Sequence, residues 1–316
     1  MKSRYGIYFH KEVHVMATLA PKKIAFDRIL VPSDFSDLSM SALEYAKSIA
    51  RCYGSRILLE HVSQLSSGYA PSEMPWVDLD MTLEALRQGE QKLEKHDAQL
   101  RAEGFEVETI LSSGTLQGEV IATAHDRKPD LMVLGTHAVK GVVRLFYGSD
   151  AEALLRQANC PVLVVGPKVR PVKPPVWSLR DVLCASDLNP GSARTPAFAC
   201  ALAEDHHAAF TLLHIENPVQ EKHRQPPDVG LFGNALARII SADQRLSGCD
   251  PMKSLQTVVS RKESSSEIVG LARERGSDLI VMGAHSAAEK ADHLPRGVIP
   301  SVLAEAECPL LLLRHP

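Results

Sequence analysis

A glycine-rich segment, GTHAVKGVVRLFYGS at residues 135–149, directly follows the short apolar run at residues 131–134. Small residues after a strand let backbone N–H groups approach a bound anion closely, and phosphate is the usual anion at such turns. Gly135, Gly148 and the hydroxyl of Ser149 are therefore candidate phosphate ligands. A glycine-rich turn alone is weakly specific, so its meaning depends on the segments beside it.

A second segment, ILVPSDFSD at residues 29–37, ends another apolar run with Pro32, Ser33 and Asp34. In a parallel α/β sheet, both segments would lie on the edge formed by the carboxyl ends of the strands, where such folds bind ligands. Asp34 could contact a ligand there or cap the following helix, with Asp37 as a competing cap. Both interpretations of Asp34 stay open.

The chain repeats itself, which decides the fold. Asp34 and His61 recur 153 residues later as Asp187 and His214, and the motifs GTH and CPVL recur 148 residues later as GAH and CPLL. The second copy is therefore five residues shorter in its middle. Because the histidines recur at equivalent strand ends, a shared structural hydrogen bond is favoured over catalysis.

Short apolar runs alternate with helical patterns within each copy. In the first copy we expect strands near 29–32, 57–62, 106–111, 131–134 and 161–165, and helices near 36–50, 82–103, 118–127 and 151–158. This alternation requires a parallel sheet with helices on both faces and right-handed crossovers.

Composition excludes several classes of protein. A net charge of −3 and 5% aromatic residues argue against a nucleic-acid partner, and no apolar run is long enough to span a membrane. The six cysteines are scattered without a C-x-x-C pair. We therefore expect them to be small buried hydrophobic residues in a reduced, cytoplasmic protein.

With these segments in this order, the chain resembles the universal stress protein family. Nucleotide-binding members carry Gly, two residues, Gly, nine residues, then Gly-Ser or Gly-Thr, and here the second glycine is replaced by Ala138. Alanine keeps the N–H donor but fits only where the backbone is not left-handed. The resemblance implies two tandem Rossmann-like (adenine nucleotide alpha hydrolase-like) domains, each a five-stranded parallel sheet of order 3-2-1-4-5.

The resemblance also implies a nucleotide site in the first copy. Asp34 and Val62 would lie on the adenine and ribose side, Pro32 and Ser33 would shape the turn, and backbone N–H groups of the glycine loop would hold phosphates. The cofactor would be ATP, with or without Mg²⁺. The predicted cofactor-binding residues are Pro32, Ser33, Asp34, Val62, Gly135, Ala138, Gly148 and Ser149.

The second copy lacks this loop chemistry, because Val298 stands where the hydroxyl of Ser149 would be. We expect it to keep the fold and to bind nucleotide weakly or not at all. The leading hypothesis is a cytoplasmic stress-response protein that binds ATP in the first copy as a sensor or regulator, without a catalytic residue and with little turnover. The alternatives are an interaction scaffold without nucleotide and a weak ATPase.

The expected domain limits follow from the repeat. Residues 1–23 are a leader, with Met16 as an alternative start, and residues 24–167 and 179–316 are the two domains around a proline-rich linker at 168–178. The last strand of each copy is an apolar sheet edge that invites pairing. We expect the two copies to pair with each other in the monomer, with a homodimer as a further option.

Overall fold

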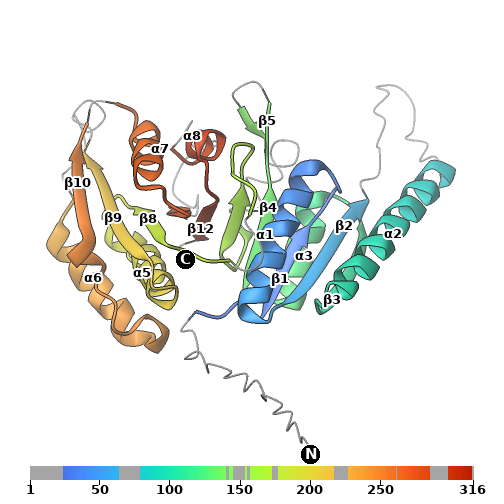
Figure 1. Cartoon of the computed structure of the whole chain (residues 1–316), viewed down its shortest axis with the longest axis horizontal. Helices are drawn as coiled ribbons and strands as arrows, with labels where there is room; N and C mark the ends of the chain where they lie inside the picture. The colour runs from blue at the N-terminus through green and yellow to red at the C-terminus, as the bar shows by residue number, and fades with distance from the viewer. Residues whose placement is uncertain are drawn as a thin grey trace, which may run out of the picture.

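The structure is a computed structural model that describes residues 24–63, 79–139, 142–144, 154, 157–172, 177–216, 227–260, 262–284 and 298–314. Two similar halves follow one another along the chain. In Figure 1 the first half, coloured blue to green, lies on the right, and the second half, coloured yellow to red, lies on the left.

Strands and helices alternate through the first half. Its elements are β1 (Arg28–Pro32), α1 (Asp37–Tyr53), β2 (Arg56–Ser63), α2 (Leu79–Ala102), β3 (Val107–Ser113), α3 (Leu116–Arg127), β4 (Leu131–Gly135), β5 (His137–Val139), β6 (Val142–Arg144) and β7 (Val162–Val165).

The second half repeats this order with extra turns of 3-10 helix. Its elements are β8 (Asp181–Ala185), η1 (Pro190–Ser192), α5 (Arg194–Asp205), β9 (Ala209–Glu216), α6 (Val229–Ala242), η2 (Gln244–Leu246), η3 (Pro251–Ser254), β10 (Leu255–Val259), α7 (Ser264–Arg275), β11 (Leu279–Ala284), α8 (Val298–Glu305) and β12 (Leu310–Arg314).

Ten strands form one sheet in the order β10-β9-β8-β11-β12-β7-β4-β1-β2-β3. All neighbours are parallel except β12 and β7, which run antiparallel where the two halves meet. Figure 1 shows these two strands side by side in the middle of the molecule. The predicted α/β class, with two Rossmann-like halves, is confirmed.

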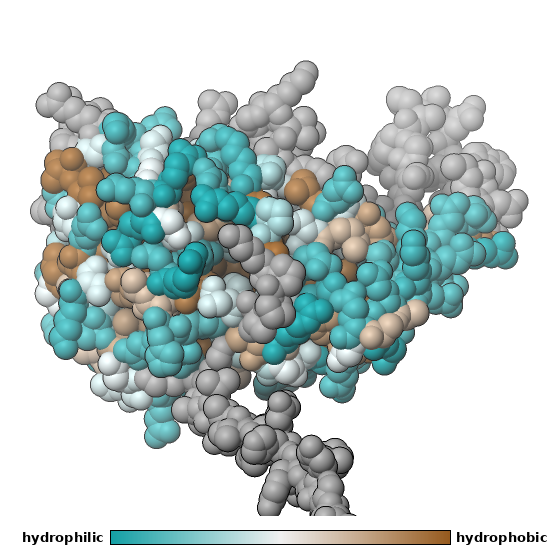
Figure 2. Space-filling model, in the orientation of Figure 1, coloured by the Kyte–Doolittle hydropathy of each residue, from teal (hydrophilic) through white to brown (hydrophobic). Residues whose placement is uncertain are grey.

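Two apolar layers cover the sheet, one on each face. Side chains of α1, α2, α5 and α6 pack on one face, and those of α3, α7 and α8 pack on the other. The inner strands are buried on both faces, as near-continuous apolar runs predict for parallel sheets, whereas the edge strands β3 and β10 are mostly half-buried or exposed. Figure 2 shows that the surface on the viewed side is largely hydrophilic over α2, with brown apolar areas at the left over the second half.

Contacts outside the sheet also join the halves. The hydroxyl of Tyr53 lies 2.9 Å from Nε2 of His206, and the backbone N–H of Ile24 donates to Asp205 over 2.7 Å. The buried ring of Trp177, from the segment between the halves, packs against Tyr53 and His206. A homodimer of the whole chain stays a prediction.

The segment between the halves is docked where it is described. Arg170 forms an ion pair with Glu307, and its carbonyl accepts a 2.8 Å hydrogen bond from the hydroxyl of Tyr45. Tyr45 belongs to the first half and Glu307 to the second. The proline-rich segment therefore helps to fix one half against the other.

The structure corrects the expectation that all six cysteines are unpaired. Cys200 of α5 and Cys249, between η2 and η3, form a disulfide, whereas Cys52, Cys160, Cys184 and Cys308 lie outside any disulfide in the described structure. Spacing gave no hint because 49 residues separate the pair. None of the helices described is both long enough and apolar enough to cross a bilayer.

Candidate functional site

The predicted site lies where the strand order changes direction, between β1 and β4. β1 pairs with β2 on one side and with β4 on the other, and all three strands end on the same edge. Pro32 and Ser33 at the end of β1 are buried, and Asp34 after them is exposed. Ligands of open α/β sheets bind outside the carboxyl ends of the strands at such a switch point.

The turn after β1 is held by short polar side chains. The hydroxyl of Ser33 accepts a hydrogen bond from the N–H of Phe35 over 3.1 Å, and Oδ1 of Asp34 accepts one from the N–H of Ser36 over 2.9 Å. Phe35 adopts a left-handed φ of 62°, which this bonding stabilises. Ser36 accepts a hydrogen bond from the N–H of Ser39 and is the N-cap of α1.

The Asp34 carboxyl is kept ionised by this turn. Its partial burial acts to raise the pKa, but hydrogen bonds from the side chain and backbone of Ser36 and from Ser39 outweigh that effect, so the pKa falls below its ordinary value. A charged carboxylate with access to solvent can accept hydrogen bonds from the hydroxyl groups of a ligand.

The second half contains the same turn. Asp187 accepts from the N–H of Asn189 over 3.0 Å, and Leu188 repeats the left-handed φ at 55°. Asp187 also accepts a 2.8 Å bond from the hydroxyl of Ser192. The turn is thus part of the shared fold, and in both halves protein groups donate hydrogen bonds to the carboxylate.

The two strand-end histidines hold the turns in place. Nδ1 of His61 lies 2.8 Å from the carbonyl oxygen of Ser33, and Nδ1 of His214 lies 2.9 Å from that of Ser186. Gly89 of α2 lies close to the ring of His61. A Cβ added at Gly89 would lie only 2.8 Å from Cδ2 of that ring, so a larger residue would not fit. The predicted structural hydrogen bond, shared by both copies, is confirmed.

Gly135 is required by packing within the first half. A Cβ at this position would lie 2.4 Å from the carbonyl oxygen of Leu38 and 3.0 Å from the nitrogen of Ser39, both in the first turn of α1. The end of β4 therefore touches the backbone of α1 directly. This glycine would be needed whether or not its N–H contacts a phosphate.

The glycine loop begins with a small hairpin, which the sequence did not predict. β5 and β6 are antiparallel, and Ala138 is paired with Val143. Ala138 therefore lies in a β-ladder, where the backbone is extended and not left-handed. Gly148 and Ser149 lie outside the described residues.

The structure brings Val62 to the end of β2, on the sheet face that carries α3. Two residues earlier on the same face is Glu60, a fully buried carboxyl that the sequence analysis overlooked. Its Oε1 accepts hydrogen bonds from Thr123 over 2.8 Å and from Ser112 over 3.1 Å, while Oε2 has no partner among the described residues. Burial raises the pKa of Glu60, although the two hydroxyls partly oppose that effect.

The second half replaces this polar group with apolar side chains. By the repeat, Glu60 corresponds to Leu213, which is 1% exposed. The strand registers place Val258 at the position of Ser112, and Leu271 stands at that of Thr123. The sequence did contain a signal for this group, because the apolar strand ILLEHV at residues 57–62 has a glutamate where FTLLHI at residues 210–215 has a leucine.

Thr136 is a second overlooked residue at the switch point. It directly follows Gly135, is fully buried, and its Oγ1 has no hydrogen-bond partner in the part of the chain that the structure describes. Its backbone N–H donates to the carbonyl of Val165 over 3.0 Å, which fixes the corner. The second half has Ala284 here. Glu60 and Thr136 are thus polar groups at and just below the rim of the first half that the second half replaces with apolar residues.

Comparison with known proteins identifies both halves. Over 142 residues the chain is 31% identical to a universal stress protein of Methanocaldococcus jannaschii, covering 44% of this chain and 82% of that protein. It is 30% identical over 146 residues to one from Thermus aquaticus, covering 44% and 98%.

A solved universal stress protein from Archaeoglobus fulgidus has a similar fold, with a TM-score of 0.67 at 17% identity, covering 92% of this chain and 97% of the other. The model of the universal stress protein family matches residues 25–166 and again residues 178–314. The chain therefore belongs to the universal stress protein family and carries two of its domains in tandem.

Proposed function

We propose that the first domain binds an adenine nucleotide, ATP with or without Mg²⁺, and acts as a cytoplasmic sensor or regulator in a stress response. The observation that carries the proposal is the switch point. There the exposed, ionised Asp34 follows β1, and the Gly135-Thr136 corner ends the neighbouring strand β4. Membership of the family supports the same assignment.

The residues present suit such a ligand. Asp34 can accept hydrogen bonds from ribose hydroxyls, and buried Val62 offers an apolar wall for a base. The buried hydroxyl of Thr136, which has no partner among the described residues, can bond to a water molecule beneath the ligand. Phosphates would be held by N–H groups of the loop from Gly135 through Ala138 to Gly148 and Ser149.

Little or no turnover is expected from the described part of this site. The hydroxyls of Ser33 and Ser36, which flank Asp34, already accept backbone N–H groups that form the turn and cap α1. A hydrolytic enzyme needs a water or hydroxyl held by a base, and these groups are committed to the fold. Binding is therefore the role that these residues support.

A scaffold without nucleotide is the second candidate. The observation in its favour is that Asp187 repeats the turn of Asp34 in a domain that lacks the loop chemistry, so the turn alone does not specify a ligand. Under this alternative, Asp34→Ala and Asp187→Ala would have equal effects, confined to stability. The nucleotide proposal requires the two variants to differ.

The test is a thermal-shift titration of nucleotide-stripped protein with ATP, with and without Mg²⁺. ATP should raise the Tm of the wild type and of Asp187→Ala, and should raise that of Asp34→Ala far less. If the two variants responded equally, or if the wild type showed no rise in Tm at millimolar ATP, the result would favour the scaffold without nucleotide. Single-turnover hydrolysis that disappears in Asp34→Ala would instead indicate an ATPase.

A further inference from the structure

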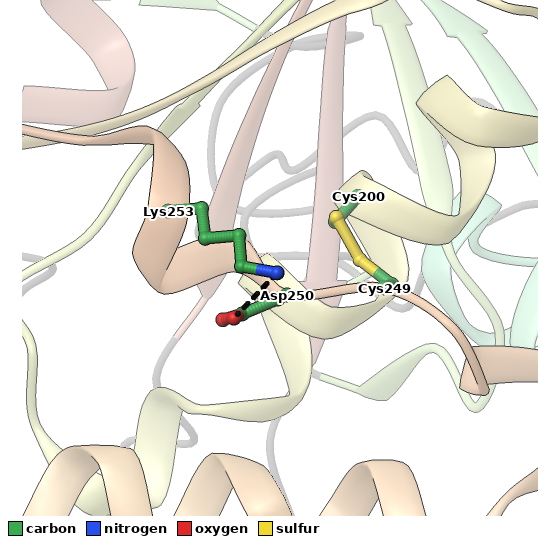
Figure 3. The surroundings of a disulfide bond; sticks show 4 residues. All are labelled: Cys200, Cys249, Asp250 and Lys253. Carbon is green, nitrogen blue, oxygen red and sulfur yellow. Dashed lines mark ion pairs between the residues drawn. A yellow bond between two sulfur atoms is a disulfide. The ribbon is translucent and has the colours of Figure 1, made fainter.

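The second domain contains a buried cysteine pair for which the nucleotide proposal has no use. Cys200, in the middle of α5, and Cys249 are 6% and 5% exposed, and their Cα atoms lie 6.1 Å apart. That distance is within the range usual for disulfides. Figure 3 shows the bond joining α5 to the segment before η3, with the exposed ion pair of Asp250 and Lys253 beside it.

The first domain has a different interaction at the same two positions. Cys200 lies 153 residues after Lys47, which is also the separation of His61 from His214. Thr109 in β3 and Leu255 in β10 are equivalent, because each pairs with the equivalent residue of the neighbouring strand, and they are 146 residues apart. Glu103 and Cys249 are also 146 residues apart, so they precede these strands at equivalent positions.

Lys47 and Glu103 form an ion pair of 2.7 Å, and Lys47 is 7% exposed. Both domains therefore link the helix after their first strand to the segment before their third strand. In the first domain the link is an ion pair, which does not depend on redox conditions. In the second it is a covalent bond between two thiols.

We propose that Cys200 and Cys249 are a reversible redox-modification site, a thiol–disulfide switch that sets how firmly α6 and the segment after it are held in the second domain. The bond closes a chain loop that contains β9, α6 and η2, so its formation restricts these elements together. In a reducing compartment such a bond is transient and responds to oxidants, unlike a bond in a secreted protein.

A low-molecular-weight disulfide is the chemical class of oxidant that the site would use. Cys249 lies in an irregular segment between the exposed residues Gly248 and Asp250, so local opening exposes it before Cys200 of the helix. The Cys249 thiolate attacks the small disulfide and releases one small thiol, forming a mixed disulfide. The Cys200 thiolate then attacks the Cys249 sulfur and releases the second small thiol, so two protein thiols are oxidised and one small disulfide is reduced.

A metal site is the competing use of the same atoms. Sulfur atoms of Cys200 and Cys249 and a carboxylate oxygen of Glu204 lie within 4.8 Å of one another. Structural zinc sites take four protein ligands, whereas this group gathers three side chains within the described ranges. The geometry therefore favours the disulfide, and zinc becomes an outcome of the test.

The experiment equilibrates the full-length protein with glutathione buffers from fully reduced to fully oxidised, traps free thiols by alkylation, and maps them by mass spectrometry. Cys200 and Cys249 should lose and regain alkylation together and reversibly, with a cross-linked peptide pair in oxidising buffer. Hydrogen exchange in residues 229–254 should slow at least tenfold on oxidation. Cys200→Ser should abolish that difference, and the control Cys52→Ser should retain it.

Three results would overturn the proposal. The pair could remain alkylated in every buffer, or it could stay bonded in folded protein under excess thiol. Alternatively, the reduced protein could bind one zinc ion per chain and protect both thiols from alkylation. The chemical mapping uses the wild-type protein, so it gives an answer even if Cys200→Ser fails to fold. None of these readouts requires nucleotide.

Discussion

The two domains share a backbone and differ in the side chains placed at equivalent points. Both have the turn after the first strand, the left-handed residue within it and the histidine that holds it. The first domain adds Glu60 and Thr136 where the second has Leu213 and Ala284. Features common to both domains belong to the fold, and those found in one domain are the candidates for function.

The second domain differs from the first in two further features. It has apolar side chains at the positions of Glu60, Ser112 and Thr123, and its helix link is a disulfide instead of an ion pair. The first domain thus carries a buried carboxyl beside its second strand, which generally reduces stability, and the second domain has apolar side chains at those positions. Exchanging residues between the domains tests this division directly.

The largest effect is expected from Leu213→Glu, which places the buried carboxyl of the first domain in the second. Val258 and Leu271 offer no hydroxyls there, so the carboxyl would be buried without partners. We expect a loss of about 4 kcal/mol in the free energy of unfolding, measured by urea denaturation. A loss below ~1 kcal/mol would show that the site is open to water.

Gly135→Ala should lower the free energy of unfolding by about 3 kcal/mol. The added methyl group would collide with the backbone of α1, which cannot move without disturbing the helix. Gly233→Ala in α6 is the matched control. Its new methyl meets nothing within 4 Å, and alanine favours helix. The first variant should unfold at much lower urea than the wild type and the second at slightly higher urea. Equal behaviour would contradict the packing explanation of Gly135.

Glu60→Leu should stabilise the protein by about 2 kcal/mol at neutral pH, because it removes a buried carboxyl with an unpartnered oxygen. The effect should depend on pH. The pKa of Glu60 is raised in the folded state, so the unfolded chain ionises first and wild-type stability falls as pH rises from the ordinary carboxyl range through the folded pKa.

Urea denaturation between pH 4 and 8 would show that dependence. The gap between Glu60→Leu and the wild type should widen as pH rises and should level off above the folded pKa of Glu60. A gap that stays constant across this range would mean that Glu60 does not change its ionisation on folding.

Lys47→Met should have the smallest effect, a loss of about 1 kcal/mol in the free energy of unfolding. Glu103 is 28% exposed, so water can solvate its carboxylate when Lys47 is lost. The loss should be the same with and without reducing agent. Reduction of the wild type should cost more, up to about 4 kcal/mol for a loop of this length. Thermal melts of the wild type and Lys47→Met, each with and without reducing agent, would measure both losses. A loss on Lys47→Met substitution that changed with reducing agent would contradict a redox-independent link in the first domain.

Repetition made most of the fold predictable. The 153-residue and 148-residue separations identified two α/β copies and paired the histidines correctly, because those features depend on local patterns. The disulfide was missed because its partners correspond to Lys47 and Glu103 only through strand register, which sequence spacing does not reveal. The expectation of unpaired cysteines was wrong for that reason.

The site was predictable in part. Asp34, Val62 and Gly135 do end neighbouring strands, but sequence could not show that Gly135 touches α1 or that Ala138 enters a hairpin. Burial of Glu60 depends on Ser112 and Thr123, which come from a different strand and a helix. Nucleotide contacts of the predicted residues stay a prediction.

The central claim is that the two domains differ in nucleotide binding, and calorimetric titration of nucleotide-stripped protein with ATP and Mg²⁺ tests it most directly. We expect one site per chain, lost in Gly148→Val/Ser149→Ala and retained in Asp187→Ala. Two equal sites per chain, or no heat at millimolar ATP together with an unchanged Tm, would contradict it.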